Sequence, residues 1–143
     1  MNTLTEELKI LVVEDEAIVA IDIRHKLQSF GYTVTGVVSS GEEALESVAK
    51  EMPDLVLLDI SLKGSMSGID IASKFKDLFS LPVIFITAHS DDITFTKALE
   101  VQPYGYIVKP FIERDIRFSI EVVRQRMQKE KMLLQKIALL EKK

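Results

Sequence analysis

The sequence predicts an α/β fold built on a doubly wound parallel sheet, because strand-like and helix-like segments alternate five times along the chain. Four of the strand-like segments are short apolar runs, which are typical of parallel strands buried on both faces. Amphipathic stretches of helix length separate them, as crossover connections between parallel strands require. With 143 residues, the chain is long enough for one well-packed domain and too short for two.

Composition identifies the five strands. They are expected at residues 10–13, 33–38, 55–58, 83–86 and 104–108. The run at 33–38 is β-branched rather than uniformly apolar, which also favours a strand. Pro82 marks the entry to the fourth strand, where a missing N–H is tolerated.

Capping and breaking residues delimit the helices. We expect helices at about 17–30, from 41 to before Pro53, at about 69–79, from 91 to before Pro103, and in one long segment after 112. Gly31 stops the first helix, and acidic residues in the first turn favour the second. On the first helix, Ile18, Ile21 and Leu27 are expected to form the apolar face.

The fifth helix is longer than one domain needs, so we expect a domain at residues 8–124 and a projecting extension at 125–143. Its first half carries a core-facing stripe at 4-3-4 spacing, formed by Ile116, Ile120, Val123 and Met127. Glu130 then interrupts the pattern, and a shifted stripe continues through Leu133, Leu134, Ile137 and Leu140. The extension is equally compatible with a dimer stalk, giving a homodimer through the fifth helix, and with a linker to an output module.

Composition excludes several classes of protein. The absence of cysteine excludes disulfides and thiolate metal sites and fits a reducing, cytoplasmic location. No apolar run approaches the roughly 18 residues of a membrane span, so no membrane contact is expected. The net charge of −4 gives no reason to expect direct nucleic-acid binding, and the net charge of +4 over residues 112–143 favours a solvated helix face.

Polar residues follow four of the five strands. Glu14 and Asp15 follow the first, Asp59 the third, Thr87 the fourth and Lys109 the fifth. Because ligands of parallel sheets gather beyond the carboxyl ends of the strands, these side chains are expected to converge. Three carboxylates suit Mg²⁺, with a backbone carbonyl of the segment 59–61 as a further ligand, and a carboxylate beside such an ion can attack phosphorus. The ammonium and the hydroxyl would stabilise the transferring oxygens.

Four fragments carry a family resemblance: Leu11-Val12-Val13-Glu14-Asp15-Glu16, Leu55-Val56-Leu57-Leu58-Asp59, Phe85-Ile86-Thr87-Ala88 and Tyr104-Gly105-Tyr106-Ile107-Val108-Lys109-Pro110-Phe111. Together and in this order they make residues 9–124 resemble a response-regulator receiver domain of two-component signalling. The resemblance implies a flavodoxin-like (βα)5 sheet of strand order 2-1-3-4-5, here with an extended C-terminal helix. The Glu-Asp pair and a Gly68 that arrives one residue late depart from the usual family pattern.

The resemblance also implies roles for individual residues of this chain. Asp59 is the expected phosphoacceptor, and Lys109 is expected to pair with the phosphoryl group. The expected Mg²⁺ ligands are Glu14, Asp15, Asp59 and the Ser61 backbone carbonyl. Thr87 and Tyr106 are the expected switch pair, and Ser61 and His89 are expected to tune the phosphoryl lifetime. The Lys109–Pro110 bond is expected to be cis.

The resemblance therefore implies a phosphoacceptor in a relay from a histidine kinase, with phosphorylation changing the surface of the fourth helix, fifth strand and fifth helix towards a partner or output module. Such a domain is not a classical enzyme, although it assists its own phosphorylation and dephosphorylation. The alternatives are a non-phosphorylated interaction module and a haloacid-dehalogenase-type phosphohydrolase, which would need an acid where Ser61 stands. A flavin phosphate would be repelled by Glu14-Asp15-Glu16.

Overall fold

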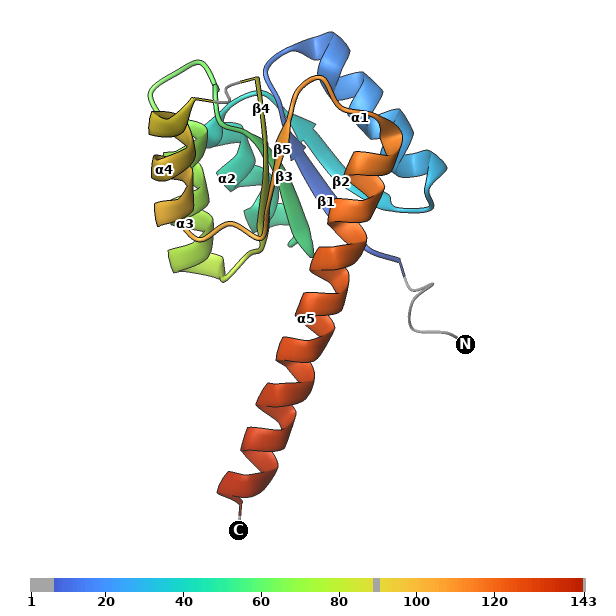
Figure 1. Cartoon of the computed structure of the whole chain (residues 1–143), viewed down its shortest axis with the longest axis vertical. Helices are drawn as coiled ribbons and strands as arrows, with labels where there is room; N and C mark the ends of the chain where they lie inside the picture. Colours follow the sequence, from blue (N-terminus) through green and yellow to red (C-terminus); the bar gives the residue numbers. More distant parts are fainter. Residues whose placement is uncertain (1–6, 89–90, 143) are drawn as a thin grey trace.

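In a computed structural model, which describes residues 7–88 and 91–142, five parallel strands alternate with five helices (Figure 1). The strands are β1 Lys9–Val13, β2 Thr33–Val38, β3 Leu55–Asp59, β4 Val83–Thr87 and β5 Gly105–Val108. The helices are α1 Ala17–Ser29, α2 Gly41–Lys50, α3 Gly68–Phe79, α4 Asp92–Glu100 and α5 Glu113–Glu141. The sheet order is β2-β1-β3-β4-β5, which confirms the fold class and the strand order.

Two apolar cores lie on opposite faces of the sheet. On one face, α2, α3 and α4 pack over the strands, with Ala44, Phe75 and Ala98 buried. On the other face lie α1 and α5, and Leu27 and Ile120 are buried between them and the strands. Because both faces are covered, β1, β3 and β4 contain almost continuous Val, Ile, Leu and Phe.

One expectation about α1 is wrong. Leu27 is buried as expected, but Ile18 is 85% exposed and Ile21 is 51% exposed, while Ala20 and Ile23 face the core instead. Apolar residues occupy several sides of this helix, so the sequence does not mark the buried side. Packing against the sheet selects the face that contains the small Ala20.

The register aligns the carboxyl ends of the central strands. Val13 lies opposite Leu58 of β3, Asp59 opposite Ile86 of β4, and Thr87 opposite Val108 of β5. The residues that end β3 and β4, or directly follow β1 and β5, therefore come together at one edge of the sheet. This alignment positions the polar groups singled out in the sequence.

The loop from β3 to α3 returns tightly to the end of β3. The Gly68 N–H donates to the Ile60 carbonyl at 3.0 Å, and a Cβ on Gly68 would lie 2.2 Å from the Asp59 carbonyl oxygen. Ser67 then begins α3 with a capping box, in which its hydroxyl accepts from the Asp70 N–H. The absence of a side chain at Gly68 thus allows the loop to pack closely against the backbone of Asp59.

Helix α5 runs past the lower edge of the sheet (Figure 1). Its 29 residues span about 43 Å at 1.5 Å per residue. Burial ends near Met127, which is partly buried, and residues 131–142 are exposed. Within residues 7–88 and 91–142, none of the helices has the length and apolar content that crossing a bilayer requires.

Replacing Gly68 by alanine tests the close approach at the end of β3. We expect Gly68→Ala to lower the free energy of unfolding by roughly 1–3 kcal/mol, because the new Cβ meets backbone atoms that have little freedom to move. Urea denaturation measures the effect. Lys63→Ala, in the same loop and with its backbone N–H retained, is the control and should change stability little. Equal stability of both variants would contradict this account of the loop.

Candidate functional site

The strand ends bring five polar residues to one edge of the sheet. Glu14 and Asp15 follow β1, Asp59 is the last residue of β3, Thr87 is the last residue of β4, and Lys109 follows β5. The Lys109 N–H donates to the Thr87 carbonyl at 2.7 Å. The structure therefore brings together the strand ends that carry these five residues.

The three acidic residues form a compact cluster. Glu14, Asp15 and Asp59 each place a carboxylate oxygen within 4.8 Å of the others. Glu14 is 3% exposed and Asp59 is 4% exposed, whereas Asp15 is partly buried. Carboxylates so close and so poorly hydrated repel one another, and their charge must be balanced by cations or protons.

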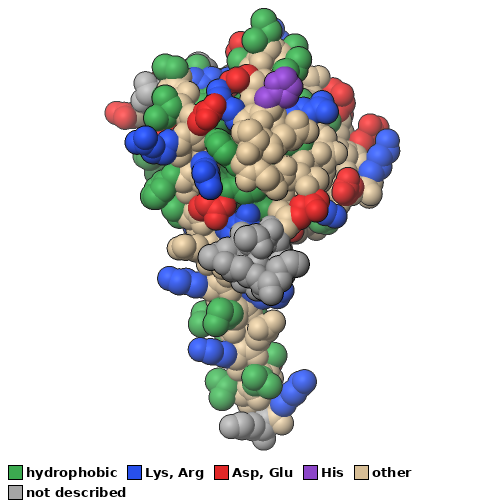
Figure 2. All heavy atoms as spheres, turned by 90° about the vertical axis from the view of Figure 1, so that its right-hand side faces the viewer, with side chains coloured by type: hydrophobic (Ala, Val, Ile, Leu, Met, Phe, Trp, Pro, Cys, Tyr) green, Lys and Arg blue, Asp and Glu red, His purple; other side chains and the backbone are tan. Residues whose placement is uncertain are grey.

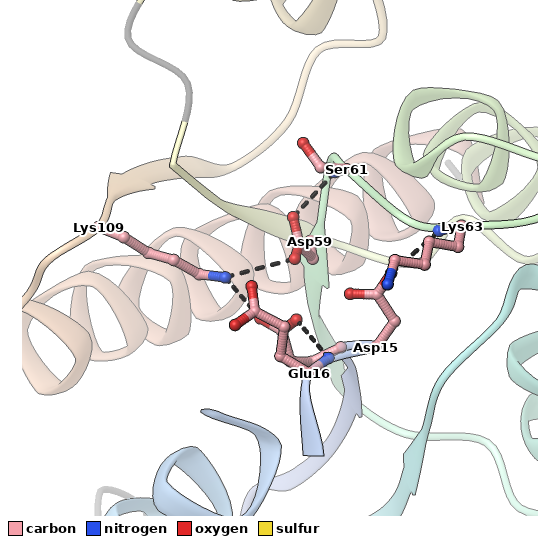
Figure 3. A network of polar contacts seen from close by, with 7 residues as sticks. Asp15, Glu16, Asp59, Ser61, Lys63 and Lys109 are labelled. Carbon is pink, nitrogen blue, oxygen red and sulfur yellow. Dashed lines mark hydrogen bonds and ion pairs between the residues drawn. The ribbon is translucent and has the colours of Figure 1, made fainter. Parts of the chain in front are cut away.

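Lys109 supplies the positive charge within the cluster. Its Nζ donates to Glu14 Oε1 at 2.8 Å and to Asp59 Oδ2 at 3.3 Å, and Figure 3 shows its side chain reaching towards Asp59. Burial alone would lower the pKa of the ammonium, but the hydrogen bond to Glu14 and the charge of Asp59 outweigh burial and raise it. Lys109 is therefore a permanent cation that holds two acids together.

Glu14 is the carboxyl group most affected by this environment. Its pKa is raised from 4.5 to about 7, chiefly by burial and also by the adjacent Asp59, while the hydrogen bond from Lys109 opposes the shift. One ammonium thus only partly compensates for two buried carboxylates. A second cation would favour the ionised form of Glu14.

Backbone N–H groups orient all three carboxylates. The Ser61 N–H donates to Asp59 Oδ1 at 2.8 Å, the Lys63 N–H to Asp15 Oδ2 at 3.0 Å, and the Glu16 N–H to Glu14 Oε2 at 3.1 Å (Figure 3). The sequence did not reveal the contributions of Lys63 and Glu16, because every residue except proline offers a backbone N–H. These bonds fix the acids without using a side chain.

The expected switch residues lie on β4 and β5. Thr87 is fully buried. Tyr106, in β5, places its ring edge-on against Phe95 of α4, with centroids 5.2 Å apart. Partial burial raises the Tyr106 pKa, with a contribution from Asp91. Tyr106 therefore faces α4 rather than the acids, and His89 lies outside the described residues.

The donor set fits a small divalent cation. Glu14, Asp15 and Asp59 offer hard carboxylate oxygens on a compact site, the chemistry that Mg²⁺ prefers. Asp15 is the most exposed of the three, so the site is open to solvent on its side.

Comparison with known proteins identifies one family that this chain matches. The family model of the response regulator receiver domain matches residues 10–121. The chain is 32% identical over 114 residues to the transcriptional regulatory protein PdtaR of Mycobacterium tuberculosis, a match that covers 80% of this chain and 55% of that protein. It is 35% identical over 116 residues to the DNA-binding response regulator MtrA of the same species, covering 81% and 49%. The chain spans about half the length of these curated relatives.

Solved structures with the same fold include the signal receiver domain of a modulated diguanylate cyclase from Desulfovibrio desulfuricans. It is 36% identical with a TM-score of 0.79, and the match covers 86% of this chain and 99% of that one. A CheY-like response regulator receiver domain from Methanospirillum hungatei is 25% identical with a TM-score of 0.80, and covers 87% and 99%.

The raised pKa of Glu14 predicts how stability depends on pH when cations are removed. Because the folded-state pKa of about 7 exceeds the ordinary value of 4.5, the folded chain holds the proton more tightly. This stabilisation is complete below about pH 4.5 and is lost as the pH rises through about 7. In a chelating buffer, we therefore expect the melting temperature to fall between about pH 5 and about pH 8.

Glu14→Gln is the matched control, because it keeps the shape and an acceptor for Lys109 but cannot ionise. Its melting temperature should vary less over the same range. A wild-type decrease that persists unchanged in Glu14→Gln would assign the pH dependence to another group.

Proposed function

This chain belongs to the response regulator receiver domain family, and we propose that it acts as a phosphorylation-dependent switch with Asp59 as the phosphoacceptor. Receiver domains are signalling proteins rather than classical enzymes. The observation that carries the proposal is the position of Asp59, buried at the end of β3 between the Lys109 ammonium and the Glu14–Asp15 pair. The alternative of a silent interaction module does not explain why five reactive groups converge.

Asp59 has the geometry of an oriented nucleophile. Its Oδ1 accepts the Ser61 N–H and its Oδ2 accepts the Lys109 ammonium, so the carboxylate cannot rotate freely. In the proposed step, a carboxylate oxygen of Asp59 attacks phosphorus, the P–N bond of a phosphohistidine donor breaks, and its electron pair leaves on the imidazole nitrogen. The product is an acyl phosphate on Asp59. Water attack on the same phosphorus breaks its bond to the Asp59 oxygen, which releases inorganic phosphate and restores the carboxylate.

Charge neutralisation makes this attack feasible. When bound by Glu14, Asp15, Asp59 and the Ser61 carbonyl, Mg²⁺ would supply positive charge to the transferring oxygens. Lys109, which follows β5 at the same edge of the sheet, contributes an ammonium that already lies within hydrogen-bond distance of Asp59. The Thr87 hydroxyl, at the neighbouring end of β4, is proposed to donate to a phosphoryl oxygen.

Phosphorylation adds a charge of about −1.5 to −2 beside Asp59. Lys109 and Thr87 would both be drawn to that charge. Thr87 ends β4 and Lys109 follows β5, the strands that precede and follow α4 in the chain. The contact between Tyr106 and Phe95 joins β5 to α4 and is therefore the proposed route to the outer surface. Exposed apolar side chains already lie there: Ile93, Phe95, Leu99, Val108, Phe118 and Val122.

The proposed partners are a histidine kinase as the donor and an output module or effector protein that contacts the surface of α4, β5 and α5. This chain matches about half the length of the transcriptional regulatory protein PdtaR and of the DNA-binding response regulator MtrA. We assign no direct nucleic-acid contact to the receiver domain itself.

Intact mass spectrometry tests the acceptor. After incubation with acetyl phosphate and Mg²⁺, we expect the wild-type chain to gain one phosphoryl group, and Asp59→Asn or a chelator to abolish the gain, because both remove the charges that the attack requires.

Asp54→Asn is the matched control, since Asp54 precedes the same strand and accepts the Lys9 N–H at the far end of the sheet. It should be phosphorylated like the wild type. Phosphorylation of Asp59→Asn to the wild-type level would remove Asp59 as the acceptor, and no phosphorylation of the wild type would favour an interaction module.

A further inference from the structure

The projecting end of α5 carries a surface that the proposed function does not use. Residues 131–142, which we call the stalk, are all exposed, and Figure 2 shows hydrophobic and basic side chains along it. Six large apolar side chains in the stalk are between 46% and 67% exposed: Met132, Leu133, Leu134, Ile137, Leu139 and Leu140. A helix that only bridges solvent is polar on all sides, so this composition indicates a contact.

Three of these side chains form a narrow stripe with heptad spacing. Leu133, Ile137 and Leu140 are separated by four and then three residues, the spacing that keeps side chains on the facing sides of paired helices. We call these three residues the seam. Leu139 is equally apolar and exposed, but it lies about 100° around the helix from Leu140 and outside the seam.

Contacts with the chain's own domain end the seam on its N-terminal side. When the heptad is continued towards the N-terminus, Glu130 and Arg126 occupy the next two core positions. The Tyr104 hydroxyl donates to Glu130 Oε2 at 2.8 Å, Arg126 Nε lies 3.3 Å from Glu130 Oε1, and the Arg126 guanidinium lies 3.9 Å from the centroid of the Tyr104 ring. Both charged groups are thus satisfied within one chain, and the apolar contact begins at Leu133.

We propose that the seam pairs with the same seam of a second copy of this chain, with the two helices parallel and in register. The charges beside the seam select this arrangement. In the heptad register, Lys129 and Lys136 occupy g positions and Glu141 occupies an e position. A parallel pair places Lys136 opposite Glu141 of the second copy, twice by symmetry. An antiparallel pair would bring the lysines of the g positions towards each other.

The seam also sets the expected strength of the pair. The seam supplies three apolar layers, and each heptad supplies two, so it is much shorter than the three or four heptads of a stable coiled coil. We therefore expect association to be reversible and to depend on concentration. The pair places two domains side by side with both C-termini pointing the same way. It does not depend on phosphorylation of Asp59.

The mass of the unphosphorylated chain, measured by sedimentation equilibrium from micromolar to millimolar concentration, tests the pairing. We expect the wild type to dimerise and Ile137→Glu to remain monomeric, because the substitution places a charge in the seam. Leu139→Glu is the matched control, with the same change of charge on an equally exposed side chain outside the seam, and should dimerise like the wild type. Circular dichroism confirms that the variants keep their helix content.

A charge exchange tests the orientation. Lys136→Glu should raise the dissociation constant several-fold by placing like charges opposite each other, and adding Glu141→Lys should restore it. A wild type that is monomeric at every concentration would overturn the proposal, as would a dimer that survives Ile137→Glu or that Leu139→Glu disrupts equally. Tighter association of Lys136→Glu would overturn the parallel orientation. Repeating the measurement with Asp59→Asn keeps these outcomes separate from the phosphorylation chemistry.

Discussion

The structure depends on holding the Glu14 and Asp59 carboxylates together in a site where water hardly reaches them. Lys109 makes this arrangement tolerable by donating to both, yet a single ammonium does not balance the acidic cluster. Burial, with a contribution from the adjacent Asp59, raises the pKa of Glu14 to about 7. The unbalanced charge explains the reactivity that we assign to the site. A hard cation and a phosphoryl group are the ligands that would complete it.

The fold provides this arrangement through elements that have little freedom to move. Parallel strands packed on both faces align their carboxyl ends, the return of the chain at Gly68 closes on the Asp59 carbonyl, and backbone N–H groups hold each acid in orientation. Because packed interiors deform little, we expect a change of charge at Asp59 to be transmitted to the neighbouring strands rather than absorbed locally. The contact of Tyr106 with Phe95 lies where such a change would reach α4.

Much of this could be predicted from the sequence, because residues at strand ends reveal both the strand and the chemistry. The strand order and the convergence of the five polar residues follow from that rule together with the family resemblance. The buried face of α1 could not be predicted, since Ile18 and Ile21 look as apolar as the residues that pack. Nor could the Tyr104 contacts with Arg126 and Glu130, which join residues more than 20 positions apart and depend on where α5 leaves the domain.

The most direct test of the central claim is calorimetric titration of the chain with beryllofluoride, a phosphoryl mimic, in the presence and absence of Mg²⁺. If excess negative charge at Asp59 makes this a joint site for a cation and a phosphoryl group, beryllofluoride should bind once per chain, only with Mg²⁺, and not to Asp59→Asn. Binding that is independent of Mg²⁺, or unchanged in Asp59→Asn, would contradict the account, as would the absence of binding to the wild type with Mg²⁺.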